Sequence, residues 1–69
     1  MQFGTVKWFD AKKGYGFIRP DANLGTDVFI HISTLEQSKL ESLASDQRVA
    51  FDVAPDSRGR LRAIIVAAA

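Results

Sequence analysis

Aromatic side chains recur at every second residue in two short runs of this sequence. Tyr15 and Phe17 alternate with glycines in the first run, Phe29 and His31 alternate with aliphatic residues in the second, and Trp8 follows a lysine in a third segment. Because alternate side chains of a β-strand point to the same face of a sheet, each pair is expected to share a face. Exposed rings stack on the bases of single-stranded nucleic acid, at about 1–3 kcal/mol per base. The spacing therefore predicts a base-stacking surface.

The residues between the rings indicate which face is buried. Ile18, Val28 and Ile30 fall on the faces opposite the rings, so they are expected to line the core. Gly14 and Gly16 are unfavourable in a strand interior unless curvature, a bulge or a close approach of another backbone requires them. The alternative is that the rings of the first run fill the core while its glycines face solvent. We favour exposed rings.

Basic residues flank the predicted ring surface. Lys7 precedes the tryptophan, Lys13 precedes the first aromatic run, and Arg58 lies in a turn near the carboxyl end, followed by Arg60 and Arg62. The net charge is only +1, so composition alone does not identify a nucleic-acid-binding protein, and any single lysine could equally serve solubility. The prediction of phosphate contacts therefore depends on where these charges lie.

Other chemistries find little support in the sequence. The chain has no cysteine, and its single histidine has no flanking carboxylate pair, so neither a disulfide nor a metal site is expected, and no cofactor. No serine has an evident histidine and acid partnership, and no loop has a phosphate-cradling pattern, which argues against an enzyme. No signal-like or membrane-spanning apolar run is visible, so we expect a cytoplasmic protein.

Five segments have the composition of strands that could position these side chains. Each is rich in β-branched or aromatic residues and is bounded by turn-forming residues. They are Gln2 to Phe9, Gly14 to Arg19, Asp27 to Ile32, Arg48 to Ala54 and Leu61 to Val66. The short turns between them predict that neighbouring strands pair antiparallel. We expect residues 1–69 to form a single domain in which the tail, 67–69, frays.

The segment from Ser33 to Gln47 is the one long connection. The run Ser33-Thr34-Leu35-Glu36 matches a capping box, which predicts a helical turn followed by irregular chain. Five short strands with one long connection between the third and the fourth are compatible with a small all-β Greek-key barrel.

Alternation along the predicted strands also assigns the core. Phe51 is expected inside the barrel, and Ala63 and Ile65 of the last strand are expected to face inward, with Val66 at a fraying end. The other two aromatic residues of the first strand, Phe3 and Phe9, are expected in the core or at an edge.

Three of these segments together resemble the signature of bacterial cold-shock proteins and of the related Y-box cold-shock domain. They are Lys7-Trp8-Phe9, Lys13-Gly14-Tyr15-Gly16-Phe17-Ile18 and Val28-Phe29-Ile30-His31, and the similarity covers nearly the whole chain. The resemblance implies a five-stranded antiparallel Greek-key barrel of the oligonucleotide/oligosaccharide-binding type. It also implies an RNA chaperone that binds single-stranded RNA or DNA, prevents or melts secondary structure, and so influences transcription and translation.

Carried over by position, the resemblance places the nucleic-acid surface on eight residues. They are Lys7, Trp8, Lys13, Tyr15, Phe17, Phe29, His31 and Arg58. Asp10 stands where asparagine is common, and its charge is expected to weaken binding slightly. Ile32 and Leu40 stand where family members commonly carry further aromatic rings, which predicts an affinity lower by roughly tenfold or more for each missing platform.

Two further expectations accompany the resemblance. The last strand lacks the proline and asparagine typical of the family and carries added arginines, which could recover attraction for phosphates. The protein is expected to be a monomer. The alternative is a small β-barrel that binds a protein segment through the same aromatic patch, with its lysines serving only solubility.

Overall fold

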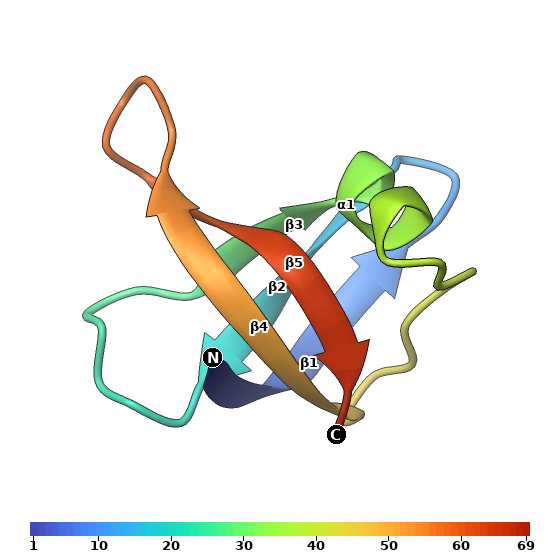
Figure 1. Ribbon diagram of the computed structural model, residues 1–69, viewed down its shortest axis with the longest axis horizontal. Helices are drawn as coiled ribbons and strands as arrows, with labels where there is room; N and C mark the ends of the chain where they lie inside the picture. Colours follow the sequence, from blue (N-terminus) through green and yellow to red (C-terminus); the bar gives the residue numbers. More distant parts are fainter.

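Five strands and one short helix make up the chain. The computed structural model describes all residues, 1–69. The strands are β1 (Gln2–Asp10), β2 (Tyr15–Pro20), β3 (Val28–His31), β4 (Arg48–Pro55) and β5 (Leu61–Ala68), and helix α1 (Ile32–Gln37) follows β3 (Figure 1). The five predicted strands are confirmed, although β3 is shorter than expected and β5 extends past Val66. No helix is long and apolar enough to cross a membrane.

The strands close into a barrel in the order β1-β2-β3-β5-β4. Strand β1 pairs antiparallel with both β2 and β4, and β4 pairs antiparallel with β5. The closing contact between β3 and β5 is parallel and consists of the single register pair Phe29 and Arg62. The strands joined by short turns pair antiparallel, as expected. The β3–β5 contact is parallel because strand directions cannot alternate all the way around a closed ring of five. The all-β Greek-key barrel itself is confirmed.

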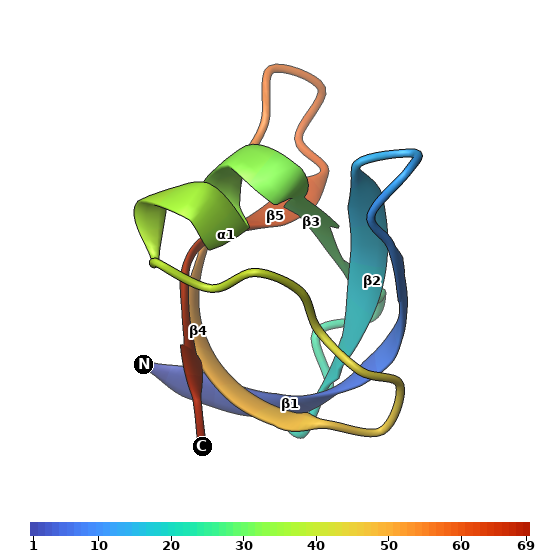
Figure 2. The same ribbon diagram turned by 90° about the vertical axis from the view of Figure 1, so that its right-hand side faces the viewer.

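Helix α1 compensates for the short contact between β3 and β5. Figure 2 shows α1 and the chain after it lying across one opening of the barrel. Leu35 is completely buried there. The Thr34 hydroxyl donates a hydrogen bond to the Ala63 carbonyl at 3.2 Å, and Ser38 Oγ accepts one from the Val66 amide at 3.2 Å. Side chains of this segment therefore satisfy backbone groups of β5 that β3 does not reach.

The barrel interior is aliphatic with one large ring. The predicted core residues Ile18, Val28, Ile30 and Phe51 are all completely buried. They pack with other apolar side chains in one cluster. The inward face of each strand is thus the one that the sequence alternation indicated.

The inward face of β5 differs from the expectation. Ala63 is buried as predicted, but Ile65 is 49% exposed and Val66 is buried. The register between β4 and β5 shifts at Asp52 and Val53, so that Ile64 has no partner on β4 and the alternation of β5 reverses after it. The prediction for Ile65 is wrong because a bulge cannot be read from strand periodicity.

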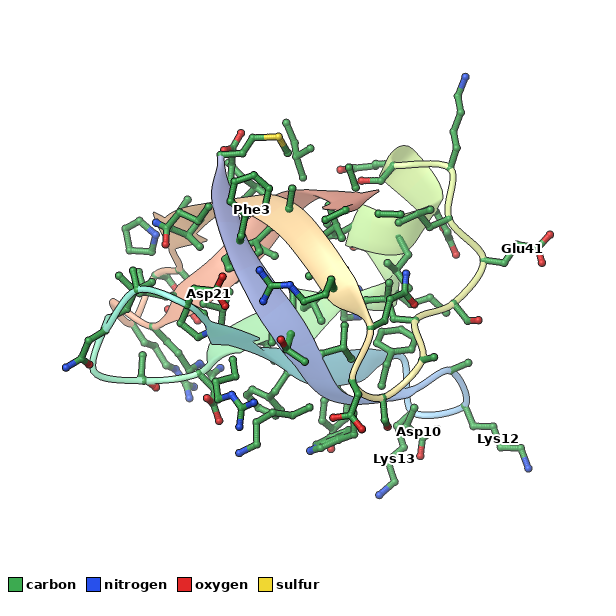
Figure 3. The ribbon with its side chains drawn as sticks, turned by 90° about the horizontal axis from the view of Figure 1, so that it is seen from below. Phe3, Asp10, Lys12, Lys13, Asp21 and Glu41 are labelled. Carbon is green, nitrogen blue, oxygen red and sulfur yellow. The ribbon has the colours of Figure 1, made fainter.

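Phe3 and Phe9 of β1 lie in different environments. Phe9 is half-buried and packs against the core cluster. Phe3 is 51% exposed, on a strand that is paired on both sides, so its expected place in the core or at an edge is wrong. In Figure 3, Phe3 lies on the opposite side of the barrel from Lys13.

Candidate nucleic-acid interface

Five aromatic side chains from three strands meet on the outer surface of the barrel. These are Trp8 of β1, Tyr15 and Phe17 of β2, and Phe29 and His31 of β3. The Trp8 ring centroid is 5.5 Å from the centroids of both β2 rings. The Phe29 centroid is 5.8 Å from both β2 rings and 6.5 Å from the ring of His31. The structure therefore brings the five predicted stacking residues together in one contiguous group, called the ring cluster below.

Strand register explains why these rings meet. Tyr15 and Phe17 of β2 are directly opposite His31 and Phe29 of β3, and Trp8 of β1 is opposite Phe17. Side chains of opposed residues lie close together on one face of an antiparallel pair. The rings are exposed or half-buried, and Trp8 is 39% exposed. The alternative in which the rings of the first run fill the core is therefore wrong.

A bulge in β1 turns two consecutive side chains toward the solvent. The pairing of β1 with β2 shifts between Val6 and Trp8, so Lys7 has no partner on β2. Val6 is buried, whereas both Lys7 and Trp8 are exposed. Regular alternation would have placed one of the two inside. The bulge thus sets a cation directly beside the first ring of the cluster.

The glycines of the first aromatic run have distinct roles. A Cβ atom at Gly16 would lie 2.7 Å from the Phe9 Cα and even closer to the Trp8 carbonyl oxygen. A close approach of another backbone was one of the three predicted reasons for a glycine in this strand, and it applies at Gly16. Gly14 precedes β2, and its φ of +83° places it in a turn rather than in the predicted strand.

The turn between β1 and β2 holds Lys13. The Asp10 carboxylate accepts hydrogen bonds from the backbone amides of Lys12 and Lys13, at 2.9 and 3.0 Å. The Gly14 amide donates to the Asp10 carbonyl at 2.8 Å. Figure 3 shows the lysine side chains extending away from the barrel, with Asp10 beside them. Asp10 therefore organises the turn that presents these lysines, a role separate from the expected weakening of binding.

A groove runs beside Trp8 and Phe17. It has a volume of about 350 Å³, and its lining includes Lys7, Asp27 and Arg60. Lys7 forms an ion pair with Asp27 at 2.9 Å, and both side chains are partly exposed. The groove therefore offers a ring surface, a carboxylate and two cations to a ligand. Sequence reasoning named Lys7 as a site residue but missed Asp27, which directly precedes β3 and contacts Lys7 only in the folded barrel.

His31 has a structural role as well as a place in the ring cluster. It is the N-cap of α1, and its Nδ1 accepts a hydrogen bond from the Ser33 amide at 3.1 Å. The predicted helical turn is confirmed, but the capping box with Ser33 as its N-cap is wrong, because the N-cap is His31, two residues earlier. The same ring thus ends β3, starts the helix and borders Phe29.

The turn between β4 and β5 places two arginines differently. Arg58 is exposed, and its backbone amide donates a hydrogen bond to the Asp56 carboxylate. Its place in the nucleic-acid surface stays a prediction. Arg60, which was absent from the predicted site, has its guanidinium carbon 5.7 Å from the Phe29 ring centroid. Hydrogen bonds from the Arg60 and Arg58 amides hold the pKa of Asp56 below its usual value.

The two positions that lack family rings are aliphatic and half-buried. Leu40 packs against the core cluster, and Ile32 opens α1, with its amide donating to the Gly14 carbonyl at 2.8 Å. Ile32 directly follows His31 at the end of the ring cluster. The structure offers no additional ring at either position.

A family model and individual relatives both match this chain over most of its length. A model of the family described as "'Cold-shock' DNA-binding domain" matches residues 2–68. The chain is 47% identical over 58 residues to cold shock protein CspA of Rhizobium meliloti, covering 84% of this chain and 83% of the relative. It is 48% identical over 59 residues to cold shock protein CspC of Bacillus subtilis, covering 86% of each.

A plant relative shows the same domain within a longer protein. The chain is 49% identical over 63 residues to cold shock domain-containing protein 4 of Arabidopsis thaliana. The matched region covers 91% of this chain but only 31% of the plant protein. The family match spans the strands that carry the ring cluster and nearly everything else in the chain. The chain therefore belongs to the cold-shock domain family.

Proposed function

We propose that this protein binds single-stranded RNA or DNA, with modest sequence preference, through the ring cluster and the cations around it. The observation that carries the proposal is the contiguity of five rings, each in contact with at least one other, on the outside of the barrel. Exposed aromatic groups of this extent mark binding surfaces on small domains. Every base has a π-face, so stacking tolerates many sequences.

The same geometry favours single strands over duplexes. A ring can stack on a base only when the face of that base is free, and in a duplex both faces are covered by neighbouring bases. Lys7 directly precedes Trp8, and Lys13 lies in the turn before Tyr15, so both cations are proposed to contact phosphates of a bound strand. The near-neutral net charge of +1 leaves little general attraction for duplex DNA.

Binding of this kind supports a role as an RNA chaperone. A protein that binds only the unpaired form of an RNA shifts the folding equilibrium of that RNA toward the unpaired state. It thereby melts or prevents secondary structure without catalysing a reaction. Transcription and translation respond to hairpins in the transcript, so we propose effects on both processes, exerted by a monomeric protein in the cytoplasm.

Titration of Trp8 fluorescence tests the binding proposal. A pyrimidine-rich single strand of RNA or DNA is expected to quench the emission, because a base stacks on the indole. The matched control is the same sequence annealed to its complement, which is expected to bind far more weakly. Absence of quenching by single strands, or tighter binding of the duplex, contradicts the proposal. A change in Trp8 emission on addition of a peptide, with no change on addition of nucleic acid, would favour a protein-binding module instead.

A fluorescent hairpin RNA tests the chaperone proposal separately. With a fluorophore and a quencher at its two ends, the hairpin is expected to brighten as wild-type protein accumulates, since binding holds the strand open. A variant with Phe17 replaced by alanine is expected to need a higher concentration for the same opening. If the protein binds single strands but does not open the hairpin, the chaperone proposal is contradicted while the proposal of single-strand binding stands.

A further inference from the structure

Two arginines of this chain lie close to Phe29. Arg62 is the register partner of Phe29 across the β3–β5 contact, and Arg60 places its guanidinium over the Phe29 ring. Leu61 is half-buried and Ala63 is buried, so the two arginines occupy the outer face of the same stretch of chain. Arg60 directly precedes β5 and Arg62 is the second residue of that strand, so their Cα atoms are at most about 7 Å apart. The junction of β3 and β5 therefore carries two adjacent cations next to the centre of the ring cluster.

Each arginine lines a different groove. Arg60 lines the groove of about 350 Å³ that Trp8 and Phe17 share. Arg62 lines a second, smaller groove of about 130 Å³ between α1 and β5, together with Ser33, Gln37 and other residues. Each of the two grooves therefore contains one guanidinium.

Both guanidinium groups can take on a new anionic partner. Arg62 is exposed and forms no ion pair with any carboxylate of the chain. Arg60 contacts Asp56 at 3.3 Å, with its own side chain 59% exposed. Exposed pairs of this kind contribute little stability, so a phosphate can replace the carboxylate at small cost. Guanidinium groups also bind phosphate oxygens in a bidentate manner.

We propose that Arg60 and Arg62 form a phosphate-binding pair that continues the nucleic-acid path from the ring cluster across the β3–β5 junction. The proposal rests on the proposed function and adds to it a second region of contact at the start of β5. A strand with a base stacked on Phe29 passes its backbone over this junction. Arg60 meets the phosphate on the side of Trp8, and Arg62 meets the phosphate on the side of α1.

The pair also accounts for a feature of the sequence. Ile32 and Leu40 provide no rings beyond His31, so base stacking ends near the place where α1 begins. Arg62 and the polar groups of the smaller groove lie beside α1. Electrostatic contacts with the backbone there take the place of stacking, which makes binding depend more strongly on salt than a surface of rings alone would.

Replacement of each arginine by glutamine tests the proposal. Glutamine removes the charge and retains a polar side chain. Anisotropy of a labelled oligothymidine, measured over a series of NaCl concentrations, gives the slope of log affinity against log salt. The slope is expected to be shallower by about 0.7 for R60Q and for R62Q, and by about 1.4 for the double variant. Affinity at fixed salt is expected to fall roughly threefold to tenfold per arginine.

Two control variants separate phosphate binding from other effects. K39Q removes one exposed positive charge from the loop after α1 and is expected to leave the slope unchanged. R62K keeps the charge and is expected to restore most of the slope lost in R62Q. Melting temperatures are recorded for every variant, because a purely structural arginine would change stability and not the salt slope.

The outcomes distinguish this proposal from the proposed function. If wild-type protein binds and R60Q/R62Q retains the wild-type slope, the arginine pair is refuted while single-strand binding stands. A loss of slope in K39Q equal to that in R62Q refutes it as well, since the effect would then be one of net charge. If wild-type protein binds no single strand, both proposals fail.

Discussion

Trp8 and Phe17 are direct cross-strand partners, with ring centroids 5.5 Å apart and planes inclined at 63°. The pairing depends on the bulge at Lys7, because without the register shift Trp8 would not face outward beside Phe17. The two rings meet edge to face, so each keeps part of its face open to solvent. This contact joins the tryptophan of β1 to the rings of β2 and β3, and it borders the groove that contains Arg60.

Replacement of Phe17 by alanine is expected to weaken single-strand binding substantially. Loss of one stacking platform of about 1–3 kcal/mol corresponds to roughly 5-fold to 150-fold in affinity. Anisotropy of a labelled oligonucleotide measures the effect without relying on Trp8 emission, which the substitution itself alters. The matched control is Phe3→Ala, which removes an exposed ring from the opposite side of the barrel and is expected to bind normally. Equal losses in the two variants would contradict the assigned surface.

Replacement of His31 by alanine is expected to lower both stability and affinity. Alanine removes the N-cap of α1, at a cost of about 1 kcal/mol, together with a ring of the cluster. Asparagine at the same position can cap the helix but cannot stack on a base. His31→Asn is therefore expected to restore the melting temperature while affinity stays low. Recovery of both properties in His31→Asn would show that the ring does not contact the ligand.

Replacement of Gly16 by alanine is expected to destabilise the barrel. The added Cβ would meet the backbone of Trp8 and Phe9, which cannot move without disturbing the β1–β2 pairing. The expected loss is about 1–3 kcal/mol, measured by urea denaturation. Gly25→Asn is the control, since Gly25 has φ near +80° with open space around it, and asparagine tolerates that conformation. An unchanged free energy of unfolding for Gly16→Ala would contradict the close approach of β1 to β2 at this position.

Acidification is expected to remove a stabilising contact between the loop after β2 and the start of β4. Hydrogen bonds from Arg48 to both Asp21 carboxylate oxygens, each at 2.7 Å, hold the pKa of Asp21 below its usual 3.8. A carboxylate with a lowered pKa stabilises the folded state above its unfolded pKa and loses this effect as pH falls through the folded value. Asp21→Asn is therefore expected to melt a few degrees lower at most at neutral pH, with the difference vanishing well below pH 3.8.

The control for this measurement is Glu41→Gln. Glu41 is exposed on the loop after α1, where Figure 3 shows it pointing into the solvent, and it forms no ion pair. Its replacement is expected to leave the melting temperature at neutral pH unchanged. A difference for Asp21→Asn that persists in acid would assign its effect to something other than the charge.

Replacement of Ile32 by phenylalanine is expected to strengthen single-strand binding by roughly tenfold. Ile32 is half-buried and follows His31 at the end of the ring cluster, so a ring there adds one stacking platform. The control is Ile65→Phe, which adds a ring at a 49% exposed position of β5 outside the cluster. Anisotropy titrations of both variants against the same oligonucleotide measure the gain. An unchanged affinity for Ile32→Phe would mean that the bound strand ends before α1.

Strand periodicity alone predicted which side of most strands is buried in this protein. The outward placement of Tyr15 and Phe17, and the burial of Ile18 and Phe51, follow from alternation that is local to each strand. The resemblance of the aromatic runs to cold-shock proteins predicted the barrel and the residues of the ring cluster, and the fold and the family are both confirmed. These features depend on residues that are close together in the chain.

Only the tertiary structure decided the features that depend on contacts between distant segments. The parallel β3–β5 contact follows from closing a ring of five strands, and it brings Arg62 beside Phe29 from more than thirty residues away. The bulges that expose Trp8 and Ile65 appear only when the register of two strands is compared. Periodicity describes one strand at a time, whereas the cations next to the rings are positioned by how separate strands meet.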